Sequence, residues 1–187
     1  MVRYSIYYFP KNVKGDTPKM RSKIKKIILA ALMAALVYVA TTIITIPSPL
    51  KGYLNLGDCM VLLAGWMLPM GYGLLAAGLG SALADVGAGY IPYAPATFLI
   101  KGLMAVIVYL CYKLLSKRIG KFPAQLIGAV LAEILMVLGY YVFEGFLYGF
   151  IPAAVNIPAN AVQGVAGMVI GLLLIKALEK ATLTDKM

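Results

Sequence analysis

Long apolar segments dominate this chain and restrict what it can fold into. They recur along its 187 residues and are closed by proline, glycine or basic residues. About 20 apolar residues in a helix cross the roughly 30 Å hydrocarbon core of a bilayer. Hydrophobic residues make up 62% of the chain and charged residues 13%, against about 45–50% and about 25% in soluble domains. The pattern predicts one all-α integral membrane domain.

Six transmembrane helices are predicted from these segments and the breakers between them. The second and third are short, because Pro69 and Gly71 mark a tight turn between two apolar stretches. The predicted ranges are 24–46, 56–68, 72–85, 96–115, 123–143 and 158–178. We therefore expect a basic tail over residues 1–23, a six-helix membrane domain over 24–178 and a C-terminal tail over 179–187.

The positive charges are placed as in a membrane protein, which argues against a nucleic-acid partner despite a net charge of +10. Of 17 Lys and Arg, all except Lys51 and Lys101 lie before residue 27, between residues 113 and 121, or after residue 175. Six spans bring these three clusters to one side, and the positive-inside rule makes that side the cytoplasm. Both tails are therefore predicted to be cytoplasmic.

Catalysis and metal binding find little support in the sequence. The chain has no His, and Cys59 and Cys111 lack the spacing of metal ligands. Neither a serine-centred nucleophile motif nor a glycine-rich phosphate loop occurs. We expect no enzyme activity, no catalytic or metal site and no cofactor.

Polar residues inside the apolar segments gather on a few helix faces. Ionisable groups in a membrane are costly, and they usually face a cavity or a partner. The predicted ligand-binding residues are Asn55, Asp85, Tyr93, Thr97, Lys101, Glu133, Tyr140, Glu144, Asn156, Asn160 and Gln163. They predict an outward-opening pocket lined by the helices at 96–115, 123–143 and 158–178 and covered by aromatic loops. Carboxylates, amides and tyrosines suit a heteroaromatic ring that bears amino or hydroxyl groups.

An internal polar network is the alternative explanation for these residues. Lys101 would then pair with Glu133 or Asp85, and side-chain amides would bond between helices, as they do in membrane bundles. Small residues on the first predicted helix raise a similar choice: Ala30, Ala31, Ala34 and Ala35 repeat at intervals of four. Such a face lets another helix approach closely, so it is predicted to bind a partner, with packing inside the protein as the alternative.

Four segments resemble one known family. They are GYLNLGD at 52–58, GSALAD at 80–85, YAPATFLIKG at 93–102 and EILMVLGY at 133–140, with Asn160 and Gln163 beyond them. These segments resemble the substrate-binding S components of energy-coupling factor (ECF) importers. The subgroup they resemble is named for riboflavin and includes carriers of hydroxymethylpyrimidine and pyridoxine.

The resemblance implies a multi-pass protein of a prokaryotic plasma membrane that captures a B-vitamin or vitamin precursor from outside. It implies a small-molecule vitamin ligand, a transmembrane coupling subunit docked on the alanine face, and two ATPase subunits that drive uptake. Two other functions stay open on the residues alone. One is an autonomous proton-coupled carrier that uses Asp85 or Glu133 as its proton site. The other is a non-transporting membrane scaffold protein.

Overall fold

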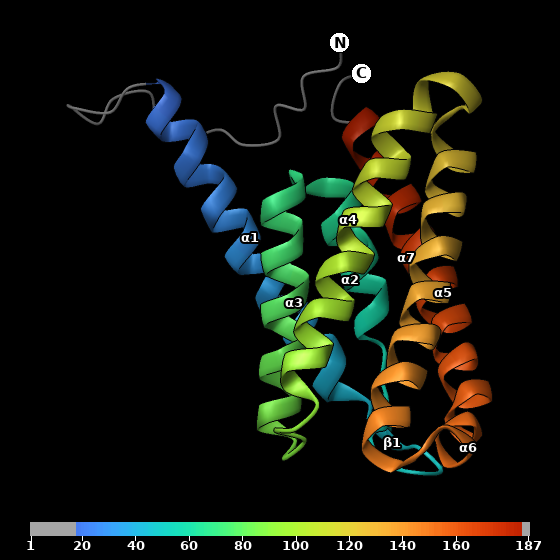
Figure 1. Cartoon of the computed structure of the whole chain (residues 1–187). Coiled ribbons are helices and arrows are strands. Elements are labelled where there is room, and N and C mark those ends of the chain that lie inside the picture. The colour runs from blue at the N-terminus through green and yellow to red at the C-terminus, as the bar shows by residue number, and fades with distance from the viewer. Residues whose placement is uncertain (1–17, 185–187) are drawn as a thin grey trace.

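Long helices fill most of the structure, a computed structural model that describes residues 18–184 (Figure 1). A helix lies at each of the six predicted places, and two elements were not predicted: a two-strand hairpin after the first helix and a short helix before the last. The elements are α1 (Pro18–Ile43), β1 (Ile46–Pro47), β2 (Tyr53–Leu54), α2 (Gly57–Met67), α3 (Met70–Gly87), α4 (Ala94–Ile119), α5 (Lys121–Tyr148), α6 (Phe150–Ala153), a 3₁₀ turn (Ala154–Asn156) and α7 (Ile157–Thr184).

Several helix ends differ from the prediction. Helix α1 is already formed at Pro18, inside the segment predicted as a tail, and α7 runs to Thr184 rather than ending near residue 178. The tail predictions for residues 1–17 and 185–187 lie outside the described residues. Helix α5 starts at Lys121, because Gly120 with φ 91° turns the chain sharply after α4. Gly149 with φ 92° ends the same helix in the same way.

Four helical stretches within residues 18–184 are long and apolar enough to cross a membrane: 22–43, 94–119, 121–148 and 150–181. Large apolar side chains point outward along them, such as Ile43 at 72% and Leu173 at 63% exposure. A soluble protein rarely exposes so much apolar surface, whereas lipid-facing helices do. The chain is therefore an almost entirely helical membrane protein that spans the bilayer several times.

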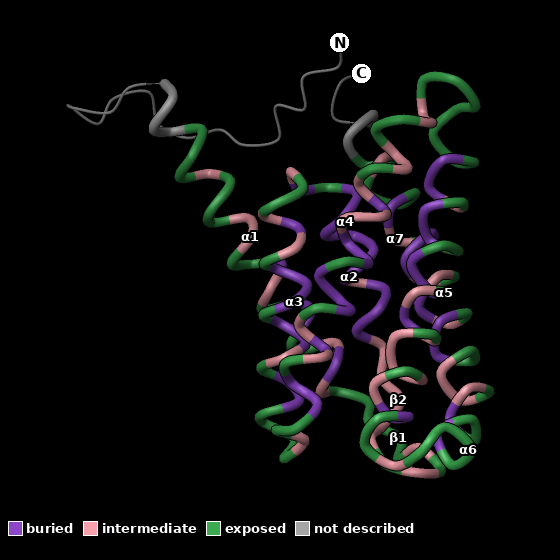
Figure 2. Tube along the Cα trace, viewed as in Figure 1, coloured by how far each residue is buried: buried purple, intermediate pink, exposed green. Residues whose placement is uncertain are grey.

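Helix α2 forms the centre of the bundle. Almost all of its 11 residues are buried, and it packs against α1, α3, α4 and α7 (Figure 2). It joins α3 through the predicted turn, in which Tyr72 and Gly73 both donate their backbone N–H groups to the Pro69 carbonyl. Being shielded by its neighbours, α2 needs neither the length nor the outward apolar face of a lipid-exposed span.

Helix α1 packs mainly on α3, and its N-terminal part diverges from the rest of the bundle (Figure 1). The contact is close: a Cβ added at Gly80 would lie 2.5 Å from the Ala34 carbonyl oxygen. Ala30 and Ala34 are half-buried against the core, while Ala31 and Ala35 are exposed. The predicted alanine face is thus divided into an inner pair that packs on the core and an outer pair.

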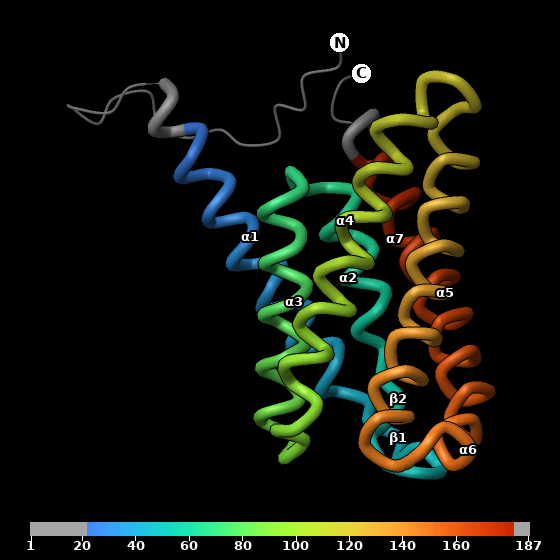
Figure 3. Tube along the Cα trace, in the orientation of Figure 1, coloured from blue at the N-terminus to red at the C-terminus, as the bar shows by residue number. Residues whose placement is uncertain are grey.

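The connections separate into two ends of the bundle (Figure 3). One end holds the start of α1, the α2–α3 turn, the α4–α5 connection and the end of α7. The other holds the β1–β2 hairpin, the loop over residues 88–93 and α6. The basic residues of the α4–α5 connection and the aromatic loops therefore lie at opposite ends, and the candidate site is at the hairpin end.

Candidate functional site

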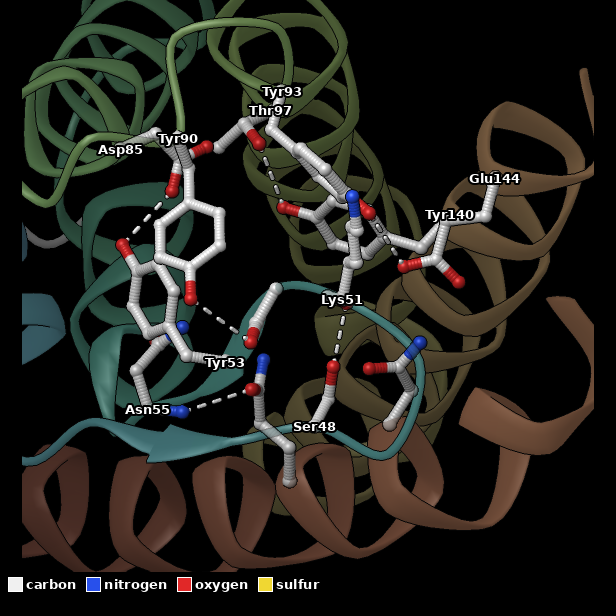
Figure 4. A pocket seen from close by; sticks show the side chains of 13 residues that line it. Ser48, Lys51, Tyr53, Asn55, Asp85, Tyr90, Tyr93, Thr97, Tyr140 and Glu144 are labelled. Carbon is white, nitrogen blue, oxygen red and sulfur yellow. Dashed lines mark hydrogen bonds between the residues drawn. The ribbon is translucent and has the colours of Figure 1, made fainter. Parts of the chain in front are cut away.

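A polar pocket of about 410 Å³, counted to its open mouth, lies between the hairpin and the helix ends beneath it (Figure 4). Its lining comes from α3, α4, α5 and α7, together with the hairpin and the loop over residues 88–93. The lining residues are Ser48, Lys51, Gly52, Tyr53, Asn55, Asp85, Tyr90, Tyr93, Thr97, Tyr140, Glu144, Asn160 and Gln163.

Most of the predicted ligand-binding residues line this pocket. They are Asn55, Asp85, Tyr93, Thr97, Tyr140, Glu144, Asn160 and Gln163. The remaining three, Lys101, Glu133 and Asn156, are buried beside or below it. The pocket also extends further than predicted, because α3 contributes Asp85 and the hairpin forms one wall.

Five lining residues were missed: Ser48, Lys51, Gly52, Tyr53 and Tyr90. All lie in the aromatic loops that were predicted only to cover the site. The hairpin pairs Ile46 with Leu54 and Pro47 with Tyr53, which folds residues 48–52 back over the helix ends. Strands of two residues carry no alternating pattern, so the sequence offered no signal for this pairing.

Asp85 anchors one side of the pocket. The Tyr53 hydroxyl donates a hydrogen bond to Asp85 Oδ1 at 2.8 Å, and the Tyr53 and Tyr90 rings lie 5.0 Å apart between centroids. Tyr90 in turn donates its hydroxyl to the Gly52 carbonyl at 3.4 Å. Figure 4 shows these groups on one side and Tyr140 and Glu144 on the other.

Glu144 anchors the opposite side and is linked to the hairpin through Asn156. Asn156 Nδ2 lies 3.0 and 2.9 Å from the two Glu144 carboxylate oxygens, and the Tyr93 hydroxyl donates to the same group at 3.3 Å. Asn156 Oδ1 also accepts a hydrogen bond from the Leu50 N–H at 3.0 Å, and Asn156 Nδ2 donates to the Lys51 carbonyl oxygen at 3.2 Å. Asn156 therefore positions both the carboxylate and the hairpin.

A chain of polar groups forms the floor of the pocket. The Asn55 N–H donates to Gln163 Oε1 at 2.9 Å, and Gln163 Nε2 donates to Asp58 Oδ2 at 2.7 Å. Asp58 Oδ1 accepts from Lys101 in a buried ion pair. The alternative explanation, an internal network, paired Lys101 with Glu133 or Asp85; the structure pairs it with Asp58 instead, because the first turn of α2 brings Asp58 against α4.

Glu133 lies below this floor and is 7% exposed. Neither of its carboxylate oxygens has a hydrogen-bond partner among the described residues. A Cβ added at Gly164 would lie 3.0 Å from Glu133 Oε2, so α7 presses closely on this side chain. Its position places Glu133 behind the lining residues instead of in direct contact with the pocket.

Two loop tyrosines remain hydrogen-bond donors over the physiological pH range. Burial raises the pKa of the Tyr53 hydroxyl well above its usual value, and the nearby Asp85 carboxylate adds to the effect. Burial likewise raises the pKa of Tyr93, reinforced by its hydrogen bond with Tyr148 and by the charge of Glu144. Both hydroxyls therefore stay protonated and donate hydrogen bonds to Asp85 and Glu144, respectively.

Three comparisons relate this chain to known proteins. The model of the family described as ECF-type riboflavin transporter, S component, matches residues 21–180. A protein of Pyrococcus woesei, described as an uncharacterized protein in a gap 3′ region, is 41% identical over 136 residues, which is 72% of this chain and 88% of that protein.

A solved structure, described as the S component of a bacterial ECF transporter, has a similar fold. The TM-score is 0.67 and the sequence identity 23%, over 84% of this chain and 97% of the other. At that identity the likeness concerns the fold alone, while the family match covers most of the sequence.

Proposed function

This chain belongs to the family of ECF-type riboflavin transporter S components, and from that premise we propose that it captures a B-vitamin or vitamin precursor in the pocket under the hairpin. As a member of this family it is a substrate-binding subunit of an ECF transporter and not an enzyme. The proposed ligands belong to the hydroxymethylpyrimidine, pyridoxine or riboflavin class. Proposed partners are a transmembrane coupling subunit and two ATPase subunits that drive uptake.

The pocket is the observation that carries this proposal. It lies at one end of a membrane bundle and combines Tyr, Asn, Gln and carboxylate side chains around one opening. Four tyrosine rings supply flat surfaces for a heteroaromatic ring, and the amides and carboxylates supply bonds to its substituents. A scaffold protein would have no need of an open pocket with this lining.

We further propose that the hairpin end faces outward and that both tails are cytoplasmic, in the plasma membrane of a prokaryote. Six spans then include α2 and α3 as shorter helices, of which α2 is shielded by its neighbours. The support is the distribution of Lys and Arg, since the α4–α5 connection carries Lys117, Arg118 and Lys121 at the end opposite the hairpin.

Cysteine labelling in intact cells tests this orientation. In a variant lacking Cys59 and Cys111, a membrane-impermeant maleimide should react with Lys51→Cys and Ala88→Cys, which lie at the hairpin end. It should reach Arg118→Cys only after permeabilisation, because that residue lies in the opposite connection. Labelling of Arg118→Cys in intact cells, with no reaction at the other two positions, would reverse the orientation.

Ligand binding by the purified protein tests the function. A thermal-shift screen first identifies the vitamin that raises the melting temperature most. Asn160→Ala should weaken the binding of that vitamin by roughly ten- to a hundredfold, because a lost hydrogen bond to a buried group costs about 1–3 kcal/mol. Val162→Ala, at an exposed α7 position, is the matched control and should bind normally.

Two further outcomes separate the proposal from its alternatives. A well-folded protein that binds no vitamin from the three classes contradicts it and favours the scaffold. Uptake that needs a proton gradient and no ATPase partners contradicts the importer role and favours an autonomous carrier.

A further inference from the structure

The two carboxylates of the pocket have neutral partners. Asp85 accepts from Tyr53, and Glu144 accepts from Asn156 and Tyr93. Asp85 is 7% and Glu144 3% exposed. Hydrogen bonds from neutral donors stabilise a carboxylate but leave its negative charge in place. Two carboxylates with no cationic hydrogen-bond partner therefore face the ligand from opposite sides of the pocket.

Neither neighbouring lysine forms an ion pair with Asp85 or Glu144 among the described residues. Lys101 is committed to Asp58 in the buried ion pair below the floor. Lys51 is exposed at the rim, where its Nζ lies 5.7 Å from the centroid of the Tyr148 ring. No ion pair joins Lys51 to either carboxylate within the described part of the chain. A buried charge without a counter-charge is costly, so the site favours a ligand that brings a positive charge.

The aromatic walls favour the same kind of ligand. Tyr53, Tyr90, Tyr93 and Tyr140 all line the pocket. The Tyr90 and Tyr93 rings meet edge to face at an interplanar angle of 87°, with centroids 6.1 Å apart, so they present differently oriented surfaces. The face of a tyrosine ring attracts a cation, and several rings around one site form the kind of cage that binds organic ammonium groups.

We propose that the ligand is a nitrogen heteroaromatic compound with a net positive charge, with a protonated amine held between Asp85 and Glu144 and its ring against the tyrosines. This inference rests on the proposed vitamin-binding function and narrows its substrate class. Neutral flavins lack the positive charge, and phosphorylated vitamins would bring negative charge toward both carboxylates.

Matched ligands that differ in charge test the inference on the purified full-length protein at pH 7. One pair is pyridoxamine, whose aminomethyl group is protonated, and pyridoxine, which has a hydroxyl there. The second pair is 4-amino-5-aminomethyl-2-methylpyrimidine and its 5-hydroxymethyl analogue. In at least one pair the amine should bind roughly ten- to a hundredfold more tightly, because hydrogen bonds to charged partners are worth about 1.5–3 kcal/mol.

Asp85→Asn keeps an oxygen that can accept from the Tyr53 hydroxyl and removes the carboxylate. It should therefore reduce the affinity ratio of the amine over the hydroxyl compound by about tenfold or more. The control is Glu179→Gln on α7, which removes a carboxylate outside the pocket, where Gln125 donates to it at 3.2 Å. The affinity ratio of the amine over the hydroxyl compound in Glu179→Gln should equal that of the unmodified protein.

Equal or tighter binding of the hydroxyl compounds overturns the inference, as does an unchanged preference in Asp85→Asn. Binding of riboflavin with no binding of either pair also overturns it, yet leaves the proposed function intact. If riboflavin, both pairs and the phosphorylated forms all fail to bind a folded protein, the proposed function itself fails.

Discussion

Lys101→Met should destabilise the folded bundle by about 3–5 kcal/mol, because it leaves a buried carboxylate without its counter-charge. Asp58 is 0% and Lys101 3% exposed, so neither group has water as a substitute partner. Gln163 would still donate to Asp58, but one neutral donor does not replace an ammonium group. The loss should be measured as the shift of the unfolding midpoint in detergent or bicelles.

The double variant Asp58→Asn/Lys101→Met separates the cost of an unpaired charge from the loss of the side chain. It removes both charges and keeps an amide oxygen that can accept from Gln163, so it should recover much of the stability. Lys117→Met changes an exposed lysine on the same helix and should remain within about 0.5 kcal/mol of the unmodified protein. A double variant no more stable than Lys101→Met would show that the ion pair is not the cause.

Ala31→Trp and Ala35→Trp should reduce vitamin uptake to the background of cells lacking the protein while the purified variants still bind ligand. We propose that the coupling subunit docks on α1, as the family resemblance implies, and this prediction rests on that proposal. Both alanines are exposed there, and neither lines the pocket. A tryptophan there would prevent the close helix approach that small residues permit in lipid. Uptake in cells with all partner subunits, and co-purification of the coupling subunit, are the measurements.

Two further substitutions distinguish docking from internal packing. Ala34→Trp lies at the contact with Gly80 of α3 and should lower the melting temperature of the isolated protein as well. Leu173→Trp places the same tryptophan side chain at an exposed α7 position and should leave uptake unchanged. Normal uptake in both outer alanine variants would contradict the docking proposal, and loss of ligand binding in them would mean that this face supports the fold.

The positions of the helices could be predicted because membrane thickness sets how many apolar residues a span requires. Periodicity also predicted that Thr97, Tyr140, Asn160 and Gln163 belong to faces that meet, since residues three, four or seven apart share a face. These features depend on local spacing. For the same reason, most of the residues that line the pocket could be predicted from the sequence.

The partner of Lys101 could not be predicted in this way, because periodicity shows which side of a helix is polar but not which helix packs there. Asp58 lies 43 residues earlier in the chain, and only the packing of α2 against α4 brings it to the lysine. The division of the alanine face also depends on tertiary packing. Ala34 is an inner residue because Gly80, which has no side chain, lets α1 pack closely against α3. Both outcomes are decided by the tertiary arrangement.

The central position of α2 has a consequence for how the chain is made. Four helices surround it, and the last of them, α7, ends at Thr184. Until α7 has been synthesised, Asp58 lacks the Gln163 amide, and the side of α2 that α7 covers stays open. Polar groups in lipid are costly while unsatisfied. A ribosome that stalls before residue 157 therefore leaves an intermediate in which Asp58 has Lys101 but not Gln163 as its partner and one side of α2 is uncovered.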